Sequence, residues 1–156
     1  MSDSPNPEET GSPEPREGSD PSAEALAEAV SAEHAAVYGC EFVGGAAGDE
    51  GRRERASAFA RQHKALRDTL RDAARERGWE APPAKASYPL PEGRGDEEMD
   101  AFAAELERRT MEAHLWLSSS PDTDLRITAA RALQESTARS LDWGAELDAL
   151  PGFERL

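Results

Sequence analysis

The chain has 156 residues, which is enough for one domain and too few for two of ordinary size. Its formal net charge of −14 at pH 7 disfavours binding to nucleic acid or to an anionic membrane, because both require a basic surface. The only cysteine, Cys40, excludes an intrachain disulfide. No apolar run resembles a signal peptide or is long enough to span a bilayer. We therefore expect a soluble cytoplasmic protein.

The first residues differ in composition from the rest. Residues 1–21 are rich in Ser, Pro, Glu, Asp and Gly and show no hydrophobic periodicity. Such a segment buries too little apolar surface to offset the entropy of ordering it, so we predict a disordered acidic tail. It is interpreted as a solubilising extension, with an interaction or localisation tail as the alternative. Residues 22–156 are predicted to form one helical domain.

Four stretches carry apolar residues at alternating spacings of three and four, which is typical of helices that pack in a bundle. The first begins at the capping pair Asp20-Pro21 and ends in the glycine-rich residues 44–48. The second follows a cap at Asp49 and stops at Gly78. The third begins near Asp96.

The fourth stretch is predicted to open at Ser120-Pro121-Asp122 and to stop before Pro151-Gly152. The residues predicted to line its buried seam are Ile127, Ala130, Leu133, Gln134, Thr137, Leu141 and Leu147.

The connections indicate how the helices are joined. Helices one and two, and helices three and four, are linked by short turns, whereas residues 78–95 separate the two pairs. This segment contains Pro82, Pro83, Pro89 and Pro91, which prevent it from continuing a helix. At roughly 3.3 Å per extended residue it is long enough to run the length of a bundle. Two hairpins joined by one long crossover are the topology of ferritin-like four-helix bundles, and we predict an all-α fold of that kind.

Ferritin-like di-iron sites use a Glu from each of two helices and a Glu-x-x-His pair from each of the other two. Here His34, His63 and His114 are preceded at minus three by Ser31, Ala60 and Met111. The fourth helix contains no histidine. The complete di-iron ligand set is therefore absent from the sequence.

Several polar residues nevertheless fall in the predicted seams. Glu33, His63 and Glu107 are expected to converge, with His114 as a fourth member, and could hold one iron, manganese or zinc ion. The alternative is a buried polar network in which His63 hydrogen-bonds Glu33 and fixes the register of the helices. Cys40, on the same seam, is interpreted as a small core residue rather than a nucleophile or a redox thiol.

Several short motifs resemble a ferritin-like family known as domain of unknown function 4439, found in high-GC Gram-positive bacteria. The resemblance covers about residues 24–153. It rests on residues 32–39 (Ala-Glu-His-Ala-Ala-Val-Tyr-Gly), His63 with Arg67-Asp68, Tyr88-Pro89-Leu90-Pro91, Leu106-Glu107, Trp143 and Leu150-Pro151-Gly152. It implies the four-helix fold and no established activity.

Two hypotheses about function follow. The first is a non-catalytic bundle that works through a protein partner or as a homodimer, with Tyr38, Phe42 and Trp116 as interface candidates. The second is a metal-binding oxidoreductase or metal-storage relative with a reduced Glu and His site. Neither hypothesis assigns a catalytic residue.

Overall fold

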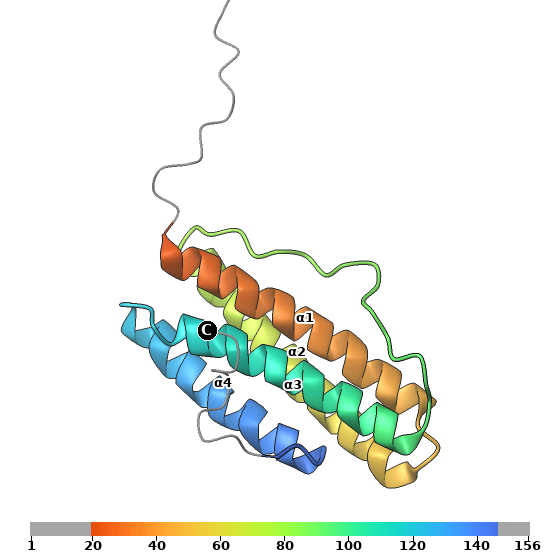
Figure 1. Cartoon of the computed structure of the whole chain (residues 1–156). Coiled ribbons are helices and arrows are strands. Elements are labelled where there is room, and N and C mark those ends of the chain that lie inside the picture. The colour runs from red at the N-terminus through yellow and green to blue at the C-terminus, as the bar shows by residue number, and fades with distance from the viewer. Residues whose placement is uncertain (1–19, 147–156) are drawn as a thin grey trace, which may run out of the picture.

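The computed structural model describes residues 20–146, which form four α-helices and, within that range, no strand. The helices are α1 (Pro21–Ala46), α2 (Glu50–Glu76), α3 (Asp96–Leu117) and α4 (Thr123–Asp142). The predicted all-α bundle is confirmed (Figure 1). Most of the predicted acidic tail lies outside the described residues. No helix in the described part is long and apolar enough to cross a membrane.

The predicted connectivity is also present. α1 and α2 form one hairpin, and α3 and α4 form the other, while the crossover runs along the bundle from the end of α2 to the start of α3 (Figure 1). The crossover is attached to α1 at two points. The Nε2 atom of His34 lies 3.0 Å from the carbonyl oxygen of Pro82, and the rings of Tyr38 and Tyr88 lie 5.3 Å apart. His34 and Tyr88 therefore hold the crossover against the bundle.

Three helices begin at aspartate caps. The side chain of Asp20 accepts a hydrogen bond from the Ser22 amide, and Asp49 accepts one from the Arg52 amide. Asp122 accepts from the amides of residues 124 and 125. α4 therefore starts at Thr123, after its cap. The predicted opening at Ser120-Pro121 is wrong, because the carboxylate that satisfies the first free N–H groups belongs to Asp122.

The core has a polar layer between two apolar clusters. One cluster comprises Ala25, Leu26, Ala29, Val30, Leu70, Ala74, Leu117, Leu125 and Ala129. The other comprises Cys40, Val43, Ala56, Phe59, Ala60, Met99, Ala103 and Trp143. On α1 the buried residues Glu33 and His34 lie between these clusters, so the polar side chains are held at mid-height in the bundle.

α1 and α3 approach closely at Gly39. A Cβ atom added there would lie 2.3 Å from Cδ1 of Leu106 and 3.2 Å from the Phe102 ring. A glycine at this position therefore allows Leu106 to pack directly against the α1 backbone. The close approach brings the adjacent Glu107 into the core beside α1.

α4 is rotated relative to the predicted seam. Ile127 and Leu141 are 54% and 43% exposed, and Ala130 and Gln134 are also exposed, so the assignment of these four residues to the core is wrong. The face that packs inward carries Leu125, Ala129, Ala132, Ser136, Arg139 and Ser140. The small side chains on this face leave room in the core for one long polar side chain. The larger side chains on the exposed face would not leave that room.

α4 also ends earlier than predicted. Its last residue is Asp142, the backbone amide of Trp143 bonds back to the final turn, and Gly144 adopts φ +87°. A positive φ at glycine is a common helix stop. Leu147, predicted on the same helix, lies outside the described residues.

α4 packs mainly against α3 and touches α2 only lightly. A groove of about 520 Å³ opens on the α2–α4 side, lined by polar and small residues that include Gln62, Thr128 and Glu135. Within residues 20–146, α2 and α4 are therefore packed less closely than the other three pairs of neighbouring helices.

Candidate functional site

All four predicted site residues meet in the polar layer. Glu33 comes from α1, His63 from α2, and Glu107 and His114 from α3. Each side chain is fully buried. The predicted convergence is confirmed, whereas the binding of a metal by these residues stays a prediction.

His63 lies between two carboxylates. Its Nδ1 atom is 2.6 Å from Oε2 of Glu33, and its Nε2 atom is 2.8 Å from Oε1 of Glu107. Ionised carboxylates only accept hydrogen bonds, so each ring nitrogen must donate a proton. The geometry therefore requires a doubly protonated, positively charged imidazole.

The electrostatic balance leads to the same protonation state. Burial lowers the pKa of His63, but the charge of Glu33 and the hydrogen bonds to Glu107 and Glu33 outweigh burial and raise it to about 9. Burial likewise raises the pKa of Glu33. The charge of His63 and the hydrogen bonds from His114 and His63 outweigh that effect and lower the pKa to about 2. Both groups are charged at neutral pH.

A fifth member of the site comes from α4 and was not among the sequence candidates. Arg139 is 4% exposed, and its Nε atom lies 3.1 Å from both carboxylate oxygens of Glu107. Its two terminal nitrogens donate to the side chains of Gln62 and Ser136, each over 3.1 Å. Arg139 thus links α4 to α3 and α2 through one guanidinium group.

The charges of this layer cancel. Glu33 and Glu107 supply two negative charges, and the imidazolium of His63 and the guanidinium of Arg139 supply two positive ones. We call these four residues the ionic layer. Because each buried charge has an opposite charge at hydrogen-bond distance, the ionic layer avoids the large cost of an unpaired buried ion.

His114 completes the coordination of Glu33. Its Nε2 atom donates to Oε1 of Glu33 over 2.8 Å, which leaves both oxygens of this carboxylate bonded to histidine. The Nδ1 atom of His114 is buried and has no hydrogen-bond partner in the described part of the chain. The structure therefore places His114 beside the ionic layer, bonded to it through one ring nitrogen only.

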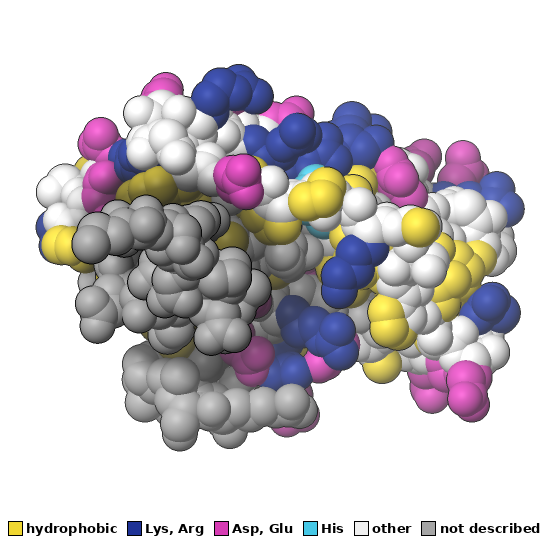
Figure 2. Space-filling model, turned by 90° about the horizontal axis from the view of Figure 1, so that it is seen from above, with side chains coloured by type: hydrophobic (Ala, Val, Ile, Leu, Met, Phe, Trp, Pro, Cys, Tyr) yellow, Lys and Arg dark blue, Asp and Glu magenta, His cyan; other side chains and the backbone are white. Residues whose placement is uncertain are grey.

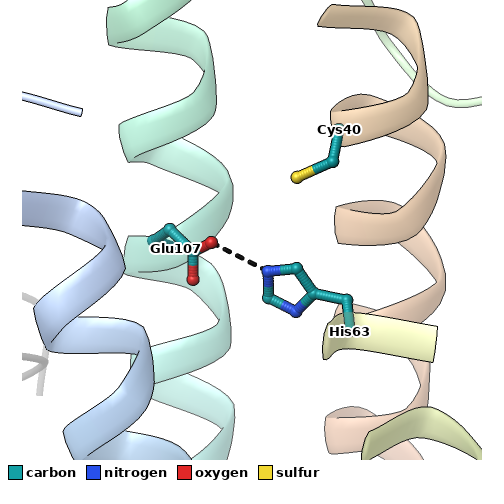
Figure 3. Close-up of side chains that lie close together, drawn as sticks. All are labelled: Cys40, His63 and Glu107. Atoms are coloured by element: carbon teal, nitrogen blue, oxygen red, sulfur yellow. Dashed lines mark hydrogen bonds and ion pairs between the residues drawn. The ribbon is translucent and has the colours of Figure 1, made fainter. Parts of the chain in front are cut away.

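Cys40, on α1, points toward the contact between His63 and Glu107 (Figure 3). Ligand atoms of Cys40, His63 and Glu107 lie within 4.8 Å of one another, which is close enough for one metal ion. Burial, followed by the nearby charge of Glu107, strongly raises the pKa of the Cys40 thiol. Because a metal binds the thiolate, this group is poorly prepared as a ligand.

The donor set does not fit a di-iron centre. Such a centre needs two Glu-x-x-His pairs, and the positions three residues before His63 and before Arg139 hold Ala60 and Ser136. The two buried glutamates are already engaged by His63, His114 and Arg139.

A sequence signal for Arg139 was present. Ala129, Ala132, Ser136 and Arg139 follow one another at spacings of three and four, and all four are buried. Small residues at this spacing indicate a helix face that packs closely. The larger apolar residues on the other side of α4 form a stronger hydrophobic pattern, but that pattern predicts the wrong buried face.

Comparison with known families assigns the chain. The family model of the domain of unknown function DUF4439 matches residues 25–155. The chain belongs to the DUF4439 family. Its fold is also similar to that of a conserved hypothetical protein from Mycobacterium tuberculosis. The crystal structure of that protein matches this chain with a TM-score of 0.75 and 27% sequence identity. That match covers 81% of the DUF4439 chain and 97% of the other protein. No curated protein matches the chain significantly.

Proposed function

We propose that this DUF4439 protein is a non-catalytic, ferritin-like bundle in which the positively charged side chains of His63 and Arg139 take the place of a metal centre. We also propose that it acts by binding another protein chain. The observation that carries the proposal is the position of Arg139, whose guanidinium contacts both oxygens of Glu107 in the middle of the bundle.

The charge pattern supports this proposal. In a di-iron bundle, metal cations neutralise carboxylates that project inward from the helices. Among the described residues of this chain, the buried carboxylates that project inward are those of Glu33 and Glu107. His63 and Arg139 neutralise their charges through direct hydrogen bonds. A metal ion entering here would have to displace protons from His63 and would face the charge of Arg139. Both effects oppose binding.

Metal analysis of protein purified without a histidine tag tests the proposal. We expect substoichiometric iron, manganese and zinc, and no change in melting temperature when these ions are added. A ligand present at about a hundred times its Kd stabilises a protein by about 2.7 kcal/mol, which would raise the melting temperature by roughly 5 °C or more. A shift of that size with stoichiometric metal would refute the proposal.

A variant provides the positive control. The changes Ala60→Glu, Ser136→Glu and Arg139→His together would create Glu-x-x-His pairs on α2 and α4. We expect this triple variant to bind iron where the parent chain does not, since it restores the ligand pattern of the di-iron bundles. If neither protein binds iron, the scaffold itself, rather than Arg139, is what prevents binding.

Metal binding is the second candidate function, and one observation favours it. The ligand atoms of Cys40, His63 and Glu107 already lie within 4.8 Å of one another. This reading requires the thiolate of Cys40, so Cys40→Ala should abolish any zinc-dependent rise in melting temperature. The same variant should leave the metal-free protein folded, because alanine retains most of the packing at this position.

Protein binding has to use the surface. Among the described residues, the large apolar side chains that are most exposed are Leu90, Trp116, Ile127 and Leu141. Of the predicted interface residues Tyr38, Phe42 and Trp116, the first two pack against aromatic neighbours, which leaves Trp116. Acidic and basic side chains are interspersed on the face shown in Figure 2, so charge alone does not select a partner there.

Light scattering at micromolar concentration tells whether the partner is a second copy of this chain or a different protein. A dimer that Ile127→Asp or Trp116→Asp disrupts would identify a second copy as the partner. A strict monomer would exclude the homodimer. A cytoplasmic location is part of the proposal, and a chain with one cysteine fits it, because its fold does not depend on the oxidising conditions that disulfides require.

A further inference from the structure

An apolar groove lies between the outer faces of α3 and α4, away from the ionic layer. It encloses about 570 Å³ and is lined on its floor by Ala101, Ala104 and Met111 of α3 and by Thr137 and Trp143 at the end of α4. Its rim carries the carboxylates of Glu97, Asp100 and Glu105 together with the guanidinium of Arg108, and Asp100 and Glu105 already pair with Arg52 and Arg108. The groove thus has apolar side chains on its floor and more acidic than basic groups at its edge.

The chain itself leads into this groove. Gly144, Ala145 and Glu146, the last described residues, are part of its lining. Ten residues follow, and they carry large apolar side chains at a regular spacing of three: Leu147, Leu150, Phe153 and Leu156. The family model extends to residue 155, so this apolar segment belongs to the DUF4439 domain rather than to an unrelated tail.

We propose that the groove between α3 and α4 is the binding site of the chain's own C-terminal segment, residues 147–156. The apolar side chains of the segment fill the groove, and Arg155, its only basic residue, meets the acidic rim.

Length and hydrogen bonding support this occupant. The groove follows α3 from Glu97 to Met111, which is about 21 Å of helix at 1.5 Å per residue. Ten extended residues reach roughly 33 Å, so the segment is long enough to follow the groove from its point of entry. The indole N–H of Trp143, in the groove wall, is buried and has no acceptor among residues 20–146. A main-chain carbonyl of a segment seated there would supply one.

The proposed contact would strengthen the attachment of α4 to α3. This helix packs on α3 and meets α2 only lightly. A segment seated across the outer α3–α4 groove would bury apolar surface on both helices at once. Burial of the leucine and phenylalanine side chains of the segment removes apolar surface from water, which favours the seated state.

Disulfide trapping in the full-length chain tests the proposal. Cysteine is introduced in the groove by Ala101→Cys or Ala104→Cys, and in the segment by Leu150→Cys or Phe153→Cys, in all four pairings. A disulfide forms only when the two Cβ atoms approach to about 3.5–4.5 Å. We expect at least one pairing to give an intramolecular disulfide on mild oxidation, seen as a monomer with two fewer free thiols.

The control pairs Leu150→Cys with Ser57→Cys, an exposed position on α2 that does not line the groove. It should give no intramolecular disulfide under the same conditions. If all four groove pairings fail to oxidise, or if they give only dimers linked between two chains, the proposal is overturned. In the second case the occupant is the segment of another copy.

A second measurement does not depend on the pairing chosen. Phe153→Ser should uncover part of the groove and increase the fluorescence of a bound apolar dye severalfold. The neighbouring Glu154→Ser, which removes no apolar surface, should leave it unchanged. Equal dye binding by the parent chain and by Phe153→Ser would contradict a groove closed by this segment.

Discussion

Replacing Arg139 by methionine removes the cation that faces Glu107 while keeping an unbranched side chain in the core. In the native chain the guanidinium donates to both oxygens of Glu107 and to the side chains of Gln62 and Ser136. Arg139→Met deletes these contacts at once. It leaves the buried carboxylate of Glu107 with one charged partner, His63.

The expected cost follows from that loss. Breaking a buried ion pair by removing one partner destabilises a protein by about 3–5 kcal/mol, because the remaining charge stays buried. A domain of this kind is stable by about 5–15 kcal/mol in total. We therefore expect Arg139→Met to remain folded at 25 °C but to lose a large fraction of its stability.

Urea denaturation followed by circular dichroism at pH 6 measures the loss, and two variants serve as controls. Arg131→Met changes an exposed arginine on the same helix and should alter the free energy of unfolding by less than about 0.5 kcal/mol. Arg139→Lys keeps the charge without the planar fork, so it should cost less than methionine. Its expected loss is about 1–2 kcal/mol, the value of the hydrogen bonds that lysine cannot reproduce.

A double-mutant cycle decides whether the loss comes from the Glu107 charge. Glu107→Gln removes the charge that Arg139 neutralises, so Arg139→Met should cost at least about 2 kcal/mol less in that background. Two results would refute the reasoning. One is a cost of Arg139→Met below about 1 kcal/mol in the native chain. The other is an unchanged cost when Glu107 is already neutral.

Two further predictions concern pH and packing. His63 has a folded pKa of about 9, above the ordinary 6.5, so its contribution to stability is complete below pH 6.5 and is lost between pH 6.5 and 9. Glu33, with a folded pKa of about 2 against 4.5, contributes above pH 4.5 and loses that contribution as the pH falls toward 2. Urea titrations should therefore place maximal stability between about pH 4.5 and 6.5. They should also show a fall of roughly 3 kcal/mol by pH 9, which a flat profile would contradict. Gly39→Ala forces a methyl group toward Leu106 and should cost about 1–3 kcal/mol in thermal unfolding. Gly45→Ala on the same helix, where an added Cβ meets nothing within 4 Å, should cost nothing, and equal losses would exclude the close approach as the cause.

The sequence predicts much of the fold because the features that determine it are local. The aspartate caps at residues 20 and 49, the glycine-rich turn after α1 and the prolines of the crossover each act within a few residues. Their spacing is enough to define the helices and the long connection. The predicted start of α4 is a few residues too early, because Ser120 and Asp122 are both acceptable caps. Only the structure shows which one bonds the first amides.

The candidate site was predictable only in part. Glu33, His63 and Glu107 lie on seams whose apolar neighbours mark the buried face, so their convergence follows from periodicity. Arg139 lies on a face marked by alanine and serine, where hydrophobic periodicity is weak. The spacing of the small residues on α4 marks a closely packed face, but the partners that Arg139 meets there are supplied by α2 and α3, and the sequence of α4 does not identify them.

The light contact between α4 and α2 has a consequence for how the molecule opens. Since α1 packs against both α2 and α3, these three helices share a continuous set of contacts, whereas α4 is attached along one side. Local opening free energies follow such differences in packing. Amide hydrogens of α4 should thus exchange with solvent before those of α1, through a partly open state in which three helices persist. Arg139 is the residue that resists this opening most directly, because releasing α4 would separate its charge from Glu107.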